Sequence, residues 1–144
     1  MRLFKTSLIP IIFILLGTLF SNAQDPNRFK DQVNELVSKE YNFNPDKKLV
    51  VFTGSSSIRM WNDVQSYFPE YNVINNGFGG SHFSDLLHFY NEMIVKPSPD
   101  FVFIYEGDND LASNKKPKKI LKEAKELTEK IQQDLPETRV IFIS

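Results

Sequence analysis

The apolar positions of this chain fall into short blocks separated by polar turns. Four blocks are nearly continuous runs of β-branched, aromatic and other apolar residues, which is typical of strands buried on both faces of a parallel sheet. These predicted strands cover residues 49–53, 71–75, 101–105 and 139–144.

Apolar residues recur at helical spacing in the segments between these blocks. Residues 28–40 predict an amphipathic helix ahead of the first strand, and further helices are predicted over residues 58–67, 83–94 and 117–134. Strands that alternate with helices favour right-handed βαβ units. The pattern therefore predicts one α/β domain built on a parallel sheet.

The last predicted strand has no cover in the sequence that follows it. Residues 140–143 read Val-Ile-Phe-Ile, as apolar as an interior strand, and the sequence ends at Ser144. Because doubly wound sheets normally bury such a strand between helices, we expect this chain to stop within its domain, after the fourth strand.

The first 23 residues have the three parts of a secretory signal peptide. A basic start that includes Arg2 and Lys5 precedes an apolar run over residues 8–20, and small or polar residues follow up to Ala23. Cleavage after Ala23 is favoured over an uncleaved anchor, because the apolar run is shorter than the roughly 20 residues that span a bilayer. We therefore expect a secreted or periplasmic domain over residues 24–144 without a stable membrane anchor.

The charge balance argues against nucleic acid as a partner. The chain has 17 Lys and Arg against 18 Asp and Glu, and its one basic cluster, residues 115–119, is predicted to be a solvated helix start. The sequence contains no cysteine, so an exported domain must rely on its packed core rather than on disulfides.

Polar or glycine-rich clusters follow three of the predicted strands, at residues 54–58, 75–81 and 106–110. The carboxyl ends of parallel strands meet at one edge of a sheet, where ligands bind. Together the clusters supply hydroxyls, unobstructed backbone N–H groups and a side-chain amide, which an acyl-transfer site needs. Each cluster alone is also compatible with an ordinary turn or helix cap.

The order of the three clusters resembles the SGNH (GDSL-type) hydrolases. Residues 50–61, VVFTGSSSIRMW, resemble block I of that family, residues 73–80, VINNGFGG, resemble block II, and residues 107–110, GDND, are similar to the Gly-x-Asn-Asp of block III. The resemblance places the family's nucleophile on Ser56 and its oxyanion-hole donors on Gly80 and Asn109.

This resemblance implies a flavodoxin-like three-layer sandwich and the hydrolysis of an ester or O-acetyl group through an acyl-enzyme. Small-molecule, lipid and glycan esters all remain open as substrates. No cofactor or metal is implied, and the better interpretation of Glu106, Asp108 and Asp110 is hydrogen bonding in a loop and a helix cap.

The sequence departs from the family pattern in two places. Ser55 stands where the family has an Asp, which leaves Ser55 and Ser57 as alternative nucleophiles. Block V, an Asp-x-x-His that supplies the base and its orienting acid near the C-terminus of family members, is absent after block III. We therefore expect the isolated chain to be inactive.

Two rival functions use the same residues. A non-catalytic secreted carbohydrate-binding module would stack a sugar on Phe78, His82 or Trp61. In the esterase interpretation, Phe78 and His82 line the substrate site, His82 is disfavoured as a general base, and His88 lies on a helix surface. A nucleotide-binding protein is disfavoured because residues 77–80, GFGG, lack the third glycine of a dinucleotide loop.

Overall fold

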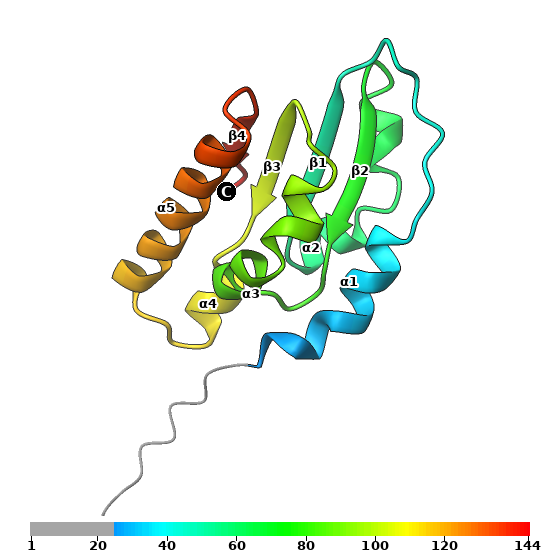
Figure 1. The fold of residues 1–144 in the computed structure, drawn as a ribbon. Helices are drawn as coiled ribbons and strands as arrows, with labels where there is room; N and C mark the ends of the chain where they lie inside the picture. Colours follow the sequence, from blue (N-terminus) through cyan, green and yellow to red (C-terminus); the bar gives the residue numbers. More distant parts are fainter. Residues whose placement is uncertain (1–24) are drawn as a thin grey trace, which may run out of the picture.

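The computed structural model describes residues 25–144, so the predicted signal peptide lies outside the described residues. Four parallel strands form one sheet with the order β2-β1-β3-β4. Their bounds are β1 Leu49–Gly54, β2 Asn72–Gly77, β3 Phe101–Tyr105 and β4 Arg139–Phe142. The four predicted strands and the parallel α/β architecture are confirmed (Figure 1).

Helices cover both faces of this sheet, giving three layers. In chain order the helical elements are the 3-10 helix η1 (Pro26–Phe29), α1 (Lys30–Val37), α2 (Ser56–Met60), the 3-10 helix η2 (Val64–Tyr67), α3 (Phe83–His88), the π-helix η3 (Asn91–Val95), α4 (Asp108–Ala112) and α5 (Pro117–Asp134). Pro117 opens α5, a position where its missing N–H costs nothing.

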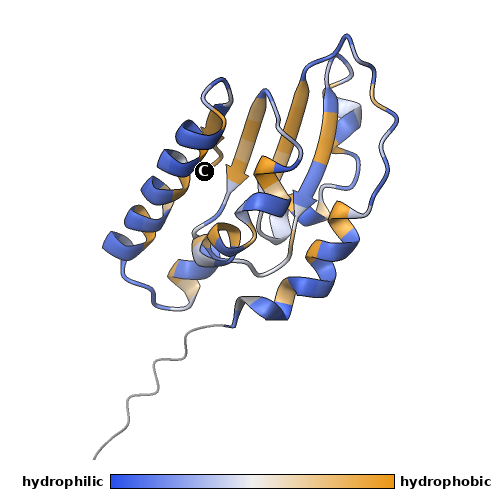
Figure 2. Ribbon diagram, in the orientation of Figure 1, coloured by the Kyte–Doolittle hydropathy of each residue, from blue (hydrophilic) through white to orange (hydrophobic). Residues whose placement is uncertain are grey.

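The larger core lies between the sheet and the layer that contains α1, α3 and α5. Alternate residues of the strands point into it, and the helices contribute the apolar stripe of each amphipathic face; its fully buried side chains include Val33, Val51, Leu86, Val102, Ile104, Leu127 and Ile131. Figure 2 shows this pattern on α5, where hydrophilic residues occupy the outer surface and hydrophobic ones face the sheet.

A smaller core occupies the opposite face, beneath α2 and η2. Val50, Phe52 and Val73 of the strands pack there against Ile58 and Val64. The ring of Trp61 joins this cluster edge-on to Phe52, with 5.6 Å between ring centroids.

Two predicted helices are interrupted. The segment 58–67 divides into α2 and η2, because Trp61 leaves helical geometry (φ −81°, ψ 69°) and its N–H donates to the Ile58 carbonyl. The segment 83–94 divides at Phe89, after which the chain continues as η3. Periodicity of apolar residues does not reveal such breaks, because both halves still face the core.

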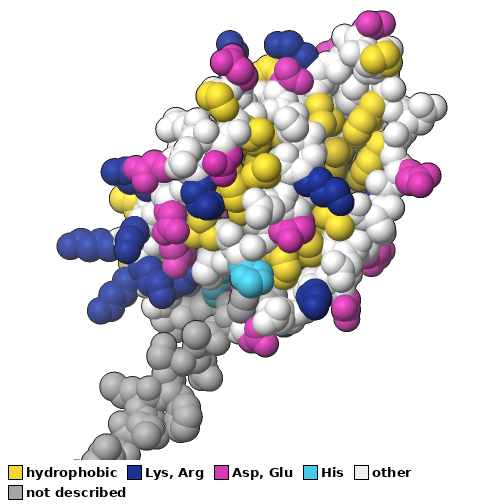
Figure 3. Space-filling view, viewed as in Figure 1, with side chains coloured by type: hydrophobic (Ala, Val, Ile, Leu, Met, Phe, Trp, Pro, Cys, Tyr) yellow, Lys and Arg dark blue, Asp and Glu magenta, His cyan; other side chains and the backbone are white. Residues whose placement is uncertain are grey.

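The side chains of the smaller core are less buried toward β4. Along β3 the burial alternates, with Val102 and Ile104 buried on the α5 side and Phe101, Phe103 and Tyr105 only half-buried on the α2 side. Among the strands described between residues 25 and 144, β4 pairs only with β3, and Phe142 is 46% exposed. Basic side chains gather over the first turns of α5 in Figure 3. None of the helices described between residues 25 and 144 has the length and apolar character needed to cross a membrane.

Candidate functional site

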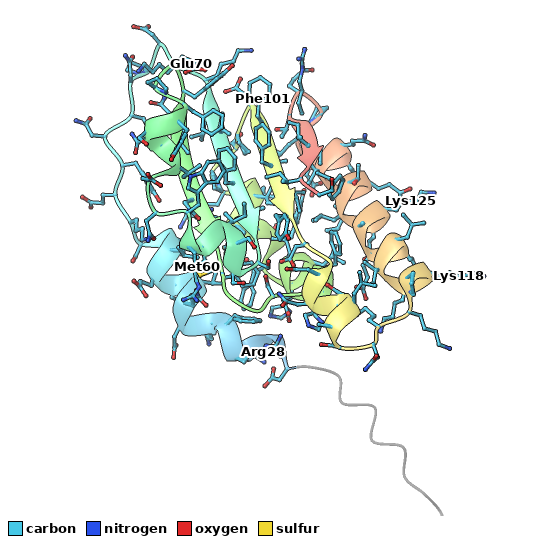
Figure 4. All side chains as sticks on the ribbon, turned by 180° about the vertical axis from the view of Figure 1, so that it is seen from behind. Arg28, Met60, Glu70, Phe101, Lys118 and Lys125 are labelled. Atoms are coloured by element: carbon cyan, nitrogen blue, oxygen red, sulfur yellow. The ribbon has the colours of Figure 1, made fainter. Side chains whose placement is uncertain are left out.

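The three polar clusters meet at the carboxyl edge of the sheet. Each begins where a strand ends: β1 runs into Ser55, β2 into Phe78 and β3 into Glu106. Figure 4 shows Arg28 at this edge, whereas Phe101, the first residue of β3, lies at the opposite edge.

The three consecutive serines differ in how far solvent reaches them. Ser55 is completely buried, donates its N–H to the Tyr105 carbonyl at 2.9 Å and accepts from the first turn of α2. Ser56, the first residue of α2, is half-buried, and Ser57 is exposed. Ser56 is therefore partly accessible to solvent while its backbone is part of α2.

Backbone hydrogen bonds tie the first cluster to the other two. The Phe78 N–H donates to the Gly54 carbonyl at 2.9 Å, in addition to the bond between Ser55 and Tyr105. Gly54 itself has φ +124°, and a Cβ there would overlap the Tyr105 carbonyl. A glycine is therefore required for β1 to turn into α2 this close to β3.

The second and third clusters are joined through Asn109. Its side-chain amide donates to the Ser81 carbonyl, with 2.9 Å between Nδ2 and the oxygen. An amide NH₂ group has two N–H bonds, so this contact orients the group and leaves one N–H for a ligand. The structure thus brings Asn109 beside the loop that carries Gly80.

Gly80 has a left-handed backbone conformation and borders open space. Its φ is +78°, and a Cβ built on it would have no heavy atom within 4 Å. Its carbonyl accepts from the Arg28 guanidinium at 3.4 Å. The carbonyl of Gly80 is therefore engaged by the N-terminal segment.

Asn75, which the sequence analysis left without a role, fixes α2 against β2. Its Nδ2 donates to the carbonyls of Ile58 and Trp61, at 2.8 and 3.0 Å, and its Oδ1 accepts from the Gly77 N–H at 2.9 Å. The C-terminal part of the helix that begins at Ser56 is thereby held against β2. Only its place within block II could have drawn attention to this residue.

Glu106 is a buried carboxyl at the centre of this edge. Its Oε1 accepts from the Ser81 hydroxyl at 2.5 Å, and its Oε2 is buried without a hydrogen-bond partner in the described part of the chain. Burial, supported by nearby carboxylates and opposed by the Ser81 hydrogen bond, raises the pKa of Glu106 from its ordinary value of 4.5 to about 8.

A second buried acid, Asp110, is neutralised by Lys115. The Lys115 ammonium lies 2.5 Å from Asp110 and 2.7 Å from Glu123. The prediction of a solvated basic cluster is therefore wrong for Lys115, because the fully buried Asp110 requires a cation. Asp110 also accepts from the Phe83 N–H at 3.2 Å, the kind of helix-cap bond that the sequence predicted.

His82 faces these groups. Its Nδ1 lies 3.8 Å from Asp110 and its Nε2 lies 3.4 Å from the Ser113 hydroxyl, while only 5% of the residue is exposed. Both ring nitrogens therefore point toward α4, and very little of the ring is available to a substrate.

Phe78 is fully buried in the larger core. Its ring packs edge-on against Phe29 and Phe89, with centroid distances of 5.2 and 6.3 Å. The expectation that Phe78 contacts substrate is corrected, because a ring with no exposed surface cannot stack on a ligand. Trp61, the other proposed sugar-stacking ring, is half-buried against Phe52 and Phe68.

The letters Asp-x-x-His occur once, at Asp85 to His88, within α3. Asp85 is buried and accepts from Arg28 at 3.1 Å and from the His82 N–H at 2.9 Å. His88 is exposed, with its ring edge-on to Phe89. These contacts hold a loop and a helix in place. They differ from the pairing of an acid with the catalytic base that it orients.

The described residues contain no cluster of three or more acidic, histidine or cysteine side chains arranged to hold a metal ion. The acids at this edge are instead bonded to serine, lysine, arginine and backbone N–H groups.

Neither a family model nor a curated protein matches this sequence. Solved structures do match its fold. A GDSL-like lipase from Bacteroides thetaiotaomicron superposes with a TM-score of 0.61 at 20% identity, over 82% of this chain and 57% of the lipase. A candidate acylhydrolase from Bacteroides fragilis gives 0.62 at 24% identity, over 81% and 55% of the two chains.

The chain has the SGNH hydrolase fold. An acetylxylan esterase from Geobacillus stearothermophilus also matches, with a TM-score of 0.54 and 17% identity over 65% of this chain and 58% of the esterase. Two of its variants are described as catalytic mutants, one changed at an Asp and the other at a His three positions later. This chain spans little more than half the length of these SGNH-fold structures.

Proposed function

We propose that this chain carries the nucleophile and the oxyanion hole of an SGNH-family serine hydrolase that cleaves esters or O-acetyl groups. The observation that carries the proposal is the set of bonds that joins the three strand-end loops: Gly54 to Phe78, Ser55 to Tyr105, and Asn109 to Ser81. They gather Ser56, Gly80 and Asn109 at one edge of the sheet.

In the proposed reaction the Ser56 hydroxyl attacks the acyl carbon and loses its proton to a general base. The oxyanion accepts hydrogen bonds from the backbone N–H groups of Ser56 and Gly80 and from the Asn109 amide. The alcohol leaves with a proton, and water then releases the acid and restores Ser56. The base and its orienting acid come from an Asp-x-x-His outside these 144 residues, the spacing of the two catalytic positions in the matched acetylxylan esterase.

The substrate class rests on the matched structures, which include acetylxylan esterases and a GDSL-like lipase. Small-molecule, lipid and glycan esters are all included in the proposal. Because a signal peptide is predicted, the proposal places the enzyme outside the cytoplasm, where polymeric esters are accessible.

The test is turnover of an aryl acetate by the natural protein at its full encoded length. We expect Ser56→Ala to abolish turnover, and Asn109→Ala to lower kcat by roughly 10²-fold or more, because a preorganised oxyanion donor contributes that much in comparable enzymes. Ser57→Ala is the matched control and should retain activity, since Ser57 is exposed.

Loss of activity in Ser57→Ala or Ser55→Ala but not in Ser56→Ala would show that the nucleophile is misassigned. Turnover that survives all three substitutions would refute the hydrolase. A non-catalytic carbohydrate-binding module would fail to react with a fluorophosphonate serine probe at any of these positions.

A further inference from the structure

Glu106 has no place in the proposed reaction, yet it occupies the centre of the site. It follows β3 directly and lies three positions before Asn109 in the chain. One carboxyl oxygen bonds the Ser81 hydroxyl, and the other is buried without a partner in the described residues. Burying a carboxyl with half of its hydrogen-bonding capacity unused is costly, so a purely structural loop bond would be better made by a smaller neutral residue.

Ser81 connects this carboxyl to both proposed oxyanion donors. Its hydroxyl donates to Glu106, its carbonyl accepts from Asn109 at 2.9 Å, and its backbone continues directly from Gly80. Ser81 is fully buried, so these bonds are shielded from water. A rotation of the Ser81 residue would therefore displace the Gly80 peptide and the Asn109 amide together.

The rest of this loop is held at its flanks. Arg28 donates to the Gly80 carbonyl and to Asp85, and Asp85 accepts from the His82 N–H. These contacts fix the two ends of the tripeptide 80–82. The orientation of its middle residue depends on the Ser81 side chain and on the Glu106 carboxyl that receives it.

We propose that Glu106 is a positioning residue which, through the Ser81 hydroxyl, sets the orientation of the Gly80 N–H and the Asn109 amide toward the oxyanion. The proposal rests on the proposed hydrolase function. Oxyanion stabilisation depends on donors that are already aligned before the charge develops, so a misaligned pair loses transition-state stabilisation while ground-state binding changes little.

The role requires a hydrogen-bond acceptor rather than a negative charge. Burial keeps the Glu106 carboxyl protonated at neutral pH, with a pKa of about 8, and the acids that face it are Asp85, Asp108 and Asp110. Glutamine has the same shape as a protonated glutamate and retains the carbonyl oxygen that accepts from Ser81. Glu106→Gln is therefore the conservative variant that preserves the contact.

The kinetic test uses the natural full-length protein and an aryl acetate. We expect Glu106→Ala and Ser81→Ala each to lower kcat by roughly 10-fold or more with little change in KM, and Glu106→Gln to retain most of the activity. The double variant Glu106→Ala/Ser81→Ala should be no slower than the slower single variant, because both changes break one contact. Glu126→Ala, an exposed acid on α5, is the matched control.

Three results would overturn the proposal: wild-type kcat in Glu106→Ala, equal losses in Glu106→Ala and Glu106→Gln, or multiplicative losses in the double variant. Thermal unfolding of each variant separates misfolding from misalignment, since a well-folded Ser81→Ala with reduced kcat still tests the contact if Glu106→Ala fails to fold.

A second measurement is independent of turnover. In ¹⁵N-resolved NMR spectra, the Asn109 side-chain amide and the Gly80 backbone amide should shift in Glu106→Ala and Ser81→Ala but stay near their wild-type positions in Glu106→Gln. Unchanged signals in both alanine variants would overturn the positioning role. If Ser56→Ala remains active while these signals move as expected, the hydrolase mechanism fails and the positioning of the loop stands.

Discussion

At the residue scale, the three serines of block I show how one motif separates into distinct environments. The same residue type is buried as Ser55, half-buried as Ser56 and exposed as Ser57, because β1 ends at Gly54 and a helix begins at once. Successive residues of that first helical turn point in different directions. The turn therefore leaves Ser56 partly accessible, between a buried serine and an exposed one.

Glu106 makes a residue-scale prediction about stability and pH. Its pKa is near 4.5 in the unfolded chain and about 8 in the folded one. Between these values the unfolded chain has released the proton while the folded chain still binds it, so the free energy of unfolding falls as pH rises. The maximal slope for one such group is about 1.4 kcal/mol per pH unit.

Glu106→Gln has no proton to lose at this position. We therefore expect its free energy of unfolding to exceed that of the wild type by a margin that grows from pH 5 to pH 8. Urea unfolding at several pH values measures this difference in the free energy of unfolding. The other titrating groups contribute nearly equally in both proteins, so their effects largely cancel. Parallel curves for the two proteins across this range would contradict the assignment of a buried, proton-binding Glu106.

At the scale of elements, α4 and α5 are joined by a buried ion pair. Lys115 lies in the loop between them and bridges Asp110 of α4 to Glu123 of α5. Its side chain is only 14% exposed, so the lysine is packed at the junction. The basic segment at the start of α5 therefore has two parts: Lys115 neutralises buried carboxylates, and the remaining lysines are solvated.

Removing this cation should destabilise the fold. Lys115→Met leaves two carboxylates without their partner, and we expect a loss of about 3 kcal/mol, the lower end of the range for breaking a buried pair. Lys118→Met on exposed α5 is the matched control and should change stability by no more than about 0.5 kcal/mol. Equal effects of the two substitutions in chemical denaturation would show that the bridge contributes nothing.

At the scale of the whole molecule, the two faces of the sheet differ near β4: helices cover one face well and the other only partly. Phe101, Phe103 and Ile141 are half-buried there, and they line a hollow of about 630 Å³ beside the edge strand. An apolar edge strand with unpaired backbone groups is a template for pairing with another chain. We expect the isolated 144-residue polypeptide to self-associate through β4.

Ile141→Lys should reduce this association, because a charged side chain on an edge strand opposes pairing between chains. Leu121→Lys is the matched control: Leu121 is 71% exposed on α5, so its replacement removes apolar surface elsewhere. Size-exclusion chromatography with light scattering measures the effect. A monomeric wild type, or equal improvement from both substitutions, would refute the role of β4.

Export is a further prediction for the whole chain. The basic, apolar and small-residue segments of residues 1–23 predict that the mature protein begins at Gln24 or Asp25. N-terminal sequencing of the secreted protein checks this expectation. A protein that retains Met1 in the membrane fraction would contradict it.

The sequence by itself determined the elements and their order. Apolar runs, helical spacing and turn residues depend on local chemistry, so strands β1 to β4 and the start of α5 at Pro117 were predictable. The order of the three strand-end clusters also sufficed to place Ser56, Gly80 and Asn109 on the carboxyl edge of the sheet, because parallel strands deliver their ends to the same side.

Only the tertiary structure decided how the residues of those clusters are used. Phe78 follows a strand end and could have faced a ligand, but its ring packs between Phe29 and Phe89, which belong to two separate helical segments. Lys115 and Glu106 look like loop residues until Asp110, Glu123 and Ser81 are placed around them. Burial and ionic partnership arise from contacts between separate segments, and local sequence pattern does not encode those contacts.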